Sequence, residues 1–181
     1  MQIRPPLGLL LWGLLRVGAV SFPYESRQLT DQDIGTSSVI SFGNVSSVPS
    51  VYRGPKCKVQ PEDAAWPSKE QWDQLNATVN GNLLKPHPVG AACYPNRAEY
   101  NESTCAYLVG QATTTRFFFN DPLSCLTTWG EGATCLQLVN TTGRTCTQGG
   151  FPVYVVNATS VRDIQAAVNF ARNQNVRLVI K

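Results

Sequence analysis

The six cysteines of this 181-residue chain are the residues whose type and spacing could do chemistry, and that chemistry is disulfide formation. An even number of thiols favours pairing in an oxidising compartment, with three bridges as the maximum. The candidates are Cys57, Cys93, Cys105, Cys125, Cys135 and Cys146. Cys135 and Cys146 flank a Thr-Thr-Gly turn, which favours a local bridge, but spacing alone does not choose among the possible connectivities.

The sequence gives little support for a metal site or a phosphate-binding loop. No cysteine pair has Cys-x-x-Cys spacing, and the one histidine, His87, lies in the turn-like "KPHP", so a zinc site has almost no ligands. Gly149 and Gly150 precede an expected strand, whereas a dinucleotide fingerprint has its glycines after a strand and opening a helix. We therefore predict no metal site and no phosphate loop here.

Five Asn-x-Ser/Thr sequons with a non-proline middle residue can accept a glycan in a eukaryotic secretory pathway. They begin at Asn44, Asn76, Asn101, Asn140 and Asn157. One such sequence arises easily by chance, whereas five in a chain of this length indicate secretion.

The N-terminus has the three parts of a signal peptide. Arg4 precedes an apolar stretch over 7–15, and Val17 to Ala19 supply small residues for cleavage. That stretch is much shorter than the roughly 20 residues that cross a bilayer. We predict a signal over 1–19, a secreted product and no membrane association after cleavage. Cleavage removes Arg4 and Arg16, which leaves 13 basic against 12 acidic residues and gives no reason to expect a nucleic-acid partner.

Residues 20–55 are rich in Ser, Gly, Gln and Pro, and we expect a flexible leader there. The stretch "WPSKEQWDQLNATVNGNLL" that follows predicts a helix. Ser68 caps it, Gln71 closes a capping box, and Gly81 ends it in the left-handed conformation. Its apolar face comprises Trp72, Leu75 and Val79.

The middle of the chain has a weaker pattern. A helix is expected around Thr104 to Ala112. The consecutive Phe117, Phe118 and Phe119 cannot all face one way on a strand, so at least one must contact another element.

The last 31 residues predict a strand, a helix and a second strand. The first strand is Val153 to Val156, Ser160 caps the helix with Asp163 near its positive end, and the second strand is Val176 to Ile180. One helical stripe should face the sheet, with Ala167 alongside: Val161, Ile164, Val168 and Ala171. The residues expected to face water are Arg162, Asn169, Arg172 and Asn173. A βαβ unit of this kind should be right-handed with parallel strands.

The second strand is apolar on both sides, and one helix covers only one face. Two strands are also fewer than a stable sheet needs. We therefore expect Val176 to Lys181 to continue into further strands, so that the chain holds only the opening of a domain. The alternative is that the cysteine-rich segment folds back over the second face.

The segment "PVYVVNATSVRDIQAAVNFARNQNVRLVIK" resembles the start of the flavin-binding domain of secreted fungal FAD-linked oxidoreductases. These are of the vanillyl-alcohol oxidase (VAO) or PCMH type, and include relatives of berberine bridge enzyme and isoamyl alcohol oxidase. Upstream, "WPSKEQWDQLNATVNGNL" and "NDPLSC" resemble the N-terminal extension of the same group, so the resemblance covers most of the chain after about Lys56.

The resemblance implies an α+β fold, with a disulfide-stapled extension over 56–120 and the truncated start of a PCMH-type FAD-binding domain over 121–181. In that family a Gly-His loop, which cradles the FAD pyrophosphate, follows the position of Lys181. Lys181 is thus the candidate approach to a cofactor site. No catalytic residue is expected in this chain, and FAD is not expected to stay bound to it alone.

The function implied is flavin-dependent oxidation of an alcohol or similar small organic substrate, with dioxygen as electron acceptor, by an enzyme of which this chain is an inactive N-terminal part. The oligomeric state is not predicted. The alternative is a non-enzymatic, secreted, cysteine-rich glycoprotein with a binding role.

Overall fold

A computed structural model describes residues 28–43, 57–123 and 132–181. The predicted signal at 1–19, the sequon at Asn44 and Cys125 lie outside these residues. The elements, in chain order, are α1 (Asp31–Ile34), α2 (Lys69–Thr78), β1 (Leu83–Leu84), the 3₁₀ helix η3 (Val89–Cys93), α3 (Glu102–Gln111), α4 (Thr115–Asn120), β2 (Val155–Val156) and α5 (Val161–Asn173). None of the described helices has the length and hydropathy needed to cross a membrane.

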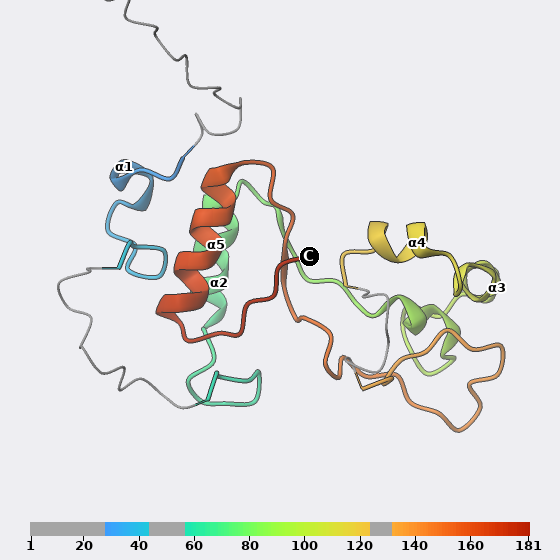
Figure 1. Ribbon diagram of the computed structural model, residues 1–181. Coiled ribbons are helices and arrows are strands. Elements are labelled where there is room, and N and C mark those ends of the chain that lie inside the picture. The colour runs from blue at the N-terminus through green and yellow to red at the C-terminus, as the bar shows by residue number, and fades with distance from the viewer. Residues whose placement is uncertain (1–27, 44–56, 124–131) are drawn as a thin grey trace, which may run out of the picture.

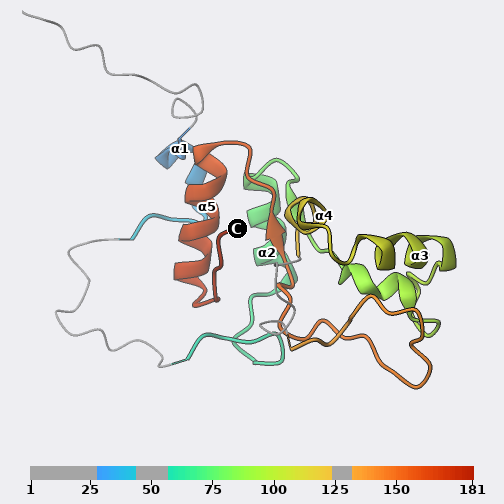
Figure 2. The same cartoon turned by 45° about the vertical axis from the view of Figure 1, so that its right-hand side comes forward.

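The chain forms two lobes, each with its own apolar core (Figures 1 and 2). The helical lobe contains α1, α2 and α5, whereas the disulfide lobe contains η3, α3, α4 and the segment 132–151. The strands β1 and β2 join the two, since Val156 packs on the first core and Val155 on the second.

The sequence prediction for α2 is confirmed. Ser68 accepts a hydrogen bond from the Gln71 backbone N–H, and the Gln71 side chain bonds back to Ser68, which completes the capping box. Gly81 has a φ of 82°, a left-handed value that suits glycine, and its N–H donates to the Asn76 carbonyl at 2.8 Å.

The core of the helical lobe is aromatic. Trp72 of α2 stacks on Tyr154 with ring centroids 4.0 Å apart, and lies 4.6 Å from Phe170 of α5 and 5.5 Å from Trp66. Trp66 and Trp72 thus have the packing role expected for tryptophans in a small core.

The expectation of a flexible leader is wrong for residues 28–43. This segment forms α1 and buries Leu29, Val39 and Ile40 in the core of the helical lobe. These three apolar side chains anchor the otherwise polar segment, and α5 also donates hydrogen bonds to its backbone. The Asn173 amide donates to the carbonyls of Ser38, Val39 and Ser41 at 2.9–3.2 Å.

Replacing Asn173 by Ala should loosen this segment. The change removes the donor to three carbonyls, and we expect a loss of about 1–2 kcal/mol in the free energy of unfolding. Limited proteolysis should cut 35–43 faster in the variant than in the parent. The exposed Arg177 provides the control, because Arg177→Ala should leave both quantities unchanged; equal cleavage of N173A and parent would contradict the assigned role.

The predicted parallel βαβ unit is also wrong. β2 pairs antiparallel with β1, with Leu83 opposite Val156 and Leu84 opposite Val155. The Asn157 N–H extends the pairing to the Asn82 carbonyl at 2.9 Å. Val176 forms one isolated parallel bridge with Val59, and residues 177–180, which belong to no strand, are exposed.

α5 is where predicted, but its buried face differs. Ile164 and Val168, expected to face a sheet, are 50% and 40% exposed. Ala171 of the predicted stripe is buried, and the other buried residues of α5 are Asp163, Ala166, Asn169 and Phe170. Asn169, expected in water, tolerates burial because its amide donates to the Ile40 carbonyl at 3.1 Å.

The disulfide lobe confirms the helix expected near Thr104, which begins two residues earlier, after the cap residue Asn101. The three phenylalanines lie in α4 rather than on a strand. Phe118 is buried whereas Phe119 is exposed, so the prediction that at least one contacts another element holds.

Candidate functional site

The C-terminal residue Lys181, the candidate approach to a cofactor, contacts the end of α4. Its ammonium donates to the carbonyl of Phe118 at 2.7 Å and also to that of Asp121. A cation at the C-terminus of a helix satisfies carbonyls that have no partner within the helix. In this structure the charge of Lys181 is therefore already engaged within the chain.

A shallow cavity of about 440 Å³ lies beside this contact, between α3 and α4. Its lining comprises Val89, Tyr107, Gln111, Thr114, Arg116, Phe117, Asn120, Asp121 and Pro122. Tyr107 and Phe117 meet edge to face, with centroids 6.5 Å apart. The lining combines aromatic and amide side chains with the charged Arg116 and Asp121, and it includes no histidine or cysteine. Sequence reasoning missed this cavity, although the run of phenylalanines signalled aromatic packing nearby.

The N-terminus of α5 is the most polar arrangement near the C-terminal segment, and a carboxylate from its own helix fills it. Asp163 Oδ2 accepts from the Thr159 and Ser160 backbone N–H groups at 2.8 and 3.0 Å, and from the Thr159 hydroxyl at 3.0 Å. Asp163 is 1% exposed. The Asp163 carboxyl therefore engages the backbone N–H groups that immediately precede α5.

The described residues do not fit an FAD pyrophosphate. Lys181 and the α5 N-terminus already have partners within the chain. Gly149 belongs to a turn against Thr134, where an added Cβ would lie 2.1 Å from Thr134 Oγ1, and it opens no helix. Among the residues that the structure places, no group of three potential ligands could hold a metal ion. We therefore derive no chemical step through a cofactor.

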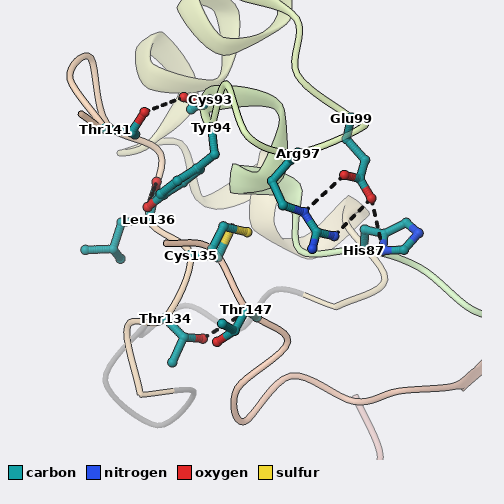
Figure 3. Close-up of a disulfide and its surroundings, with 11 residues drawn as sticks. His87, Cys93, Tyr94, Arg97, Glu99, Thr134, Cys135, Leu136, Thr141 and Thr147 are labelled. Carbon is teal, nitrogen blue, oxygen red and sulfur yellow. Dashed lines mark hydrogen bonds and ion pairs between the residues drawn. A yellow bond between two sulfur atoms is a disulfide. The ribbon is translucent and has the colours of Figure 1, made fainter. Parts of the chain in front are cut away.

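Two disulfides hold the disulfide lobe together. Cys93 joins Cys105, and Cys135 joins Cys146, so the predicted local bridge is confirmed. Cys57 is exposed and has no disulfide partner within the described ranges. Polar contacts connect the two bridges, as the Thr141 hydroxyl donates to the Cys93 carbonyl at 2.7 Å (Figure 3).

His87, predicted as a loop histidine, lies in an ion cluster at the surface of this lobe (Figure 3). Its Nδ1 is 3.2 Å from Glu99 Oε1, and Arg97 donates two hydrogen bonds to the same carboxylate at 3.1 and 3.2 Å. The backbone N–H of Glu99 is the largest cause that holds the pKa of this carboxyl below its usual value, followed by Arg97 and His87.

Because the folded-state pKa of Glu99 is lowered, its contribution to stability is present above its unfolded pKa of 4.5 and is lost as the pH falls through the folded value. Glu99→Gln should flatten the fall in melting temperature between about pH 5 and pH 3. Glu62→Gln removes an exposed carboxylate and should leave the slope unchanged. If the melting temperature of E99Q falls with pH as steeply as that of the parent, the cluster does not contribute to the stability of the fold.

The chain resembles several flavoproteins, although no protein-family model matches it. It is 36% identical to the VAO-type flavoprotein oxidase VAO615 of Thermothelomyces thermophilus over 129 residues, 70% of this chain and 22% of that protein. It is 32% identical to an FAD-linked oxidoreductase of Neocamarosporium betae, over 69% of this chain and 22% of that protein. The chain thus spans about a fifth of the length of these curated relatives.

Solved structures agree with the sequence comparison. The VAO-type flavoprotein MtVAO615 from Myceliophthora thermophila C1, solved at pH 5.0, superposes with a TM-score of 0.63 at 36% identity, over 69% of this chain and 23% of that one. MtVAO713 from the same source superposes with a TM-score of 0.61 at 32% identity, over 70% of this chain and 22% of that one. The resemblance predicted from the sequence is therefore confirmed over about 70% of the chain.

Proposed function

Because this chain is a homologue of the VAO-type, FAD-linked oxidoreductases over about 70% of its length, we propose that it forms the N-terminal part of such an enzyme. The enzyme oxidises an alcohol or a similar small organic substrate, and dioxygen accepts the electrons. FAD supplies the redox chemistry in an enzyme of this type. The observation that carries this proposal is the match to MtVAO615, in which fold and sequence agree over the same share of the chain.

The role of this chain within the enzyme is structural. Lys181 and the start of α5 make hydrogen bonds within the chain, so we propose that the groups that hold flavin come from elsewhere in the enzyme. The extension (56–120) and the start of the FAD-binding domain (121–181) remain our proposed division. We also propose secretion, supported by two disulfides among the described residues and by the sequons.

A chimera tests the proposal. The stretch of VAO615 that matches this chain is replaced by the corresponding residues of this chain, and the protein is purified without added flavin. We expect flavin absorbance and oxygen consumption with the substrate of the parent enzyme. The same swap with the matching stretch of MtVAO713 controls for the exchange itself. A folded chimera without flavin, beside a yellow control, would refute the proposal.

A non-enzymatic binding role is the second candidate, since the described residues do not fit FAD. The 181-residue chain itself should purify colourless and should not retain FAD through gel filtration. A yellow chain under these conditions would contradict both the second candidate and the structural role assigned above.

A further inference from the structure

We propose that this chain carries N-linked glycans at Asn101, Asn140 and Asn157, and that the sequon at Asn76 stays unmodified. The inference rests on the proposed secretion but not on the oxidoreductase activity. A sequon accepts sugar on its amide nitrogen Nδ2, so the folded product must leave that atom in solvent with room around it. The four described sequons differ in this respect.

Asn140 lies in an exposed loop of the disulfide lobe. Its Oδ1 accepts from the Thr142 N–H at 2.9 Å, so the oxygen and not Nδ2 makes the local contact. The next residue, Thr141, is buried and donates to the Cys93 carbonyl at 2.7 Å (Figure 3). This contact anchors the loop beside Asn140, and a glycan on the exposed amide would leave it intact.

Asn101 is also exposed, at the start of α3. Its Oδ1 accepts from the Thr104 N–H and from the Ser103 hydroxyl, both at 2.8 Å. The helix cap therefore uses the amide oxygen, which a glycosylated asparagine keeps. A glycan and the cap are compatible at this position.

Asn157 is exposed in the loop that runs from β2 to the start of α5 (Figure 1). Its backbone N–H donates to the Asn82 carbonyl, so the fold engages its main chain. The Thr159 hydroxyl bonds Asp163, which fixes the end of the sequon without using the Asn157 amide.

Asn76 differs from the other three sequon asparagines in its burial. It is half-buried in the last turn of α2, and its Oδ1 accepts from the Leu83 N–H at 3.1 Å. Its backbone carbonyl accepts from Gly81. Because Asn76 is half-buried beside this turn, its Nδ2 has less open space around it than the amides of the three exposed asparagines. A sugar there would compete with the contact that places β1 beside α2.

The modification is a transfer from a lipid-linked, diphosphate-activated oligosaccharide supplied by the host secretory pathway. The bond between the sugar C1 and the diphosphate oxygen breaks, and the lipid diphosphate leaves with the electron pair. Nδ2 forms the new bond to C1 and gives up one proton to a base of the transferase. No electrons are exchanged, so no oxidant or reductant is needed.

Two of the three sites lie next to exposed apolar side chains, which gives the glycans a physical consequence. Val139 is 88% exposed beside Asn140, and Tyr100 is 45% exposed beside Asn101. The backbone N–H of Asn101 donates to the Ala92 carbonyl, and Thr141 of the Asn140 sequon donates to the carbonyl of the next residue, Cys93. Both sequons therefore lie at the same end of η3. Glycans there would cover apolar surface that otherwise favours association.

The test is site-by-site peptide mass spectrometry of the full chain secreted by a yeast host. Four variants remove a sequon hydroxyl and keep the asparagine: Ser103→Ala, Thr142→Ala, Thr159→Ala and Thr78→Ala. Each of the first three should remove one glycan from the intact mass, whereas Thr78→Ala should remove none. Enzymatic removal of the glycans should increase light scattering on storage.

A glycan at Asn76 in the folded, secreted protein would overturn the proposal, as would a bare Asn101, Asn140 or Asn157. If the chain fails to enter the secretory pathway, a yeast leader replaces residues 1–19. Glycans at the three sites in that protein support the site assignment and refute only the native signal, and their absence refutes the assignment. The oxygen consumption of the VAO615 chimera is read separately, so either proposal can fail without the other.

Discussion

Trp72→Ala is expected to lower the free energy of unfolding by about 3–5 kcal/mol, which is the usual cost of deleting a buried aromatic side chain. Trp72 is buried in the helical lobe, where it stacks on Tyr154 and contacts Phe170 and Trp66. Removing the indole takes a shared partner from three rings at once. Urea unfolding followed by circular dichroism measures the loss.

Two variants make this prediction specific. The indole N–H of Trp72 is buried with no hydrogen-bond partner among the described residues, so Trp72→Phe removes an unsatisfied donor while it keeps a ring. Trp72→Phe should therefore cost less than half as much as Trp72→Ala. Tyr107→Ala removes a ring that is 60% exposed and should cost under about 1 kcal/mol. Equal losses for Trp72→Ala and Tyr107→Ala would refute the proposed core.

Local chemistry was readable from the sequence, because the residues that determine it are neighbours in the chain. Ser68 with Gln71 and Ser160 with Asp163 form capping boxes where the helices α2 and α5 begin. The Cys135–Cys146 bridge closes a short loop for the same reason. In each case the residues involved are at most 11 positions apart in the sequence.

The errors concern partners that are far apart in the sequence. β2 was expected to pair with Val176, but the chain places β1 beside it, and no periodicity within 153–180 carries information about Leu83. The face of α5 was misassigned because Asn169 reads as polar, although a carbonyl 129 residues away makes its burial favourable.

The candidate site follows the same pattern. Lys181 was selected by its position in a family resemblance, yet its contacts at α4 depend on carbonyls some 60 residues away. The charge of Asp163 at the α5 N-terminus was predicted, but its three hydrogen bonds, which fill that site, required the geometry of Thr159 and Ser160. The sequence thus identified the charged side chains of the candidate site. It did not indicate that these side chains already make hydrogen bonds within the chain.

Removing either disulfide should cost about 3 kcal/mol, because each closes a loop of similar length. The bridged cysteines are 12 residues apart for Cys93–Cys105 and 11 for Cys135–Cys146. The paired replacements by alanine leave no new free thiol and should give losses equal within about 1 kcal/mol, measured by urea unfolding without reductant. Cys57→Ala, at an exposed thiol without a described partner, should change stability by less than about 0.5 kcal/mol.

A variant without either bridge tests whether the two disulfides stabilise one shared cluster or two independent loops of the disulfide lobe. Cys93, Cys135 and Cys146 lie in one apolar cluster with Tyr94, whose hydroxyl donates to the Leu136 carbonyl at 3.2 Å. If the cluster depends on both bridges, the first pair removed already loosens the surroundings of the second, and the combined loss falls below the sum of the two. A strictly additive loss would show that the bridges stabilise independent loops, and a loss under about 1 kcal/mol for either pair alone would contradict the loop-closure argument.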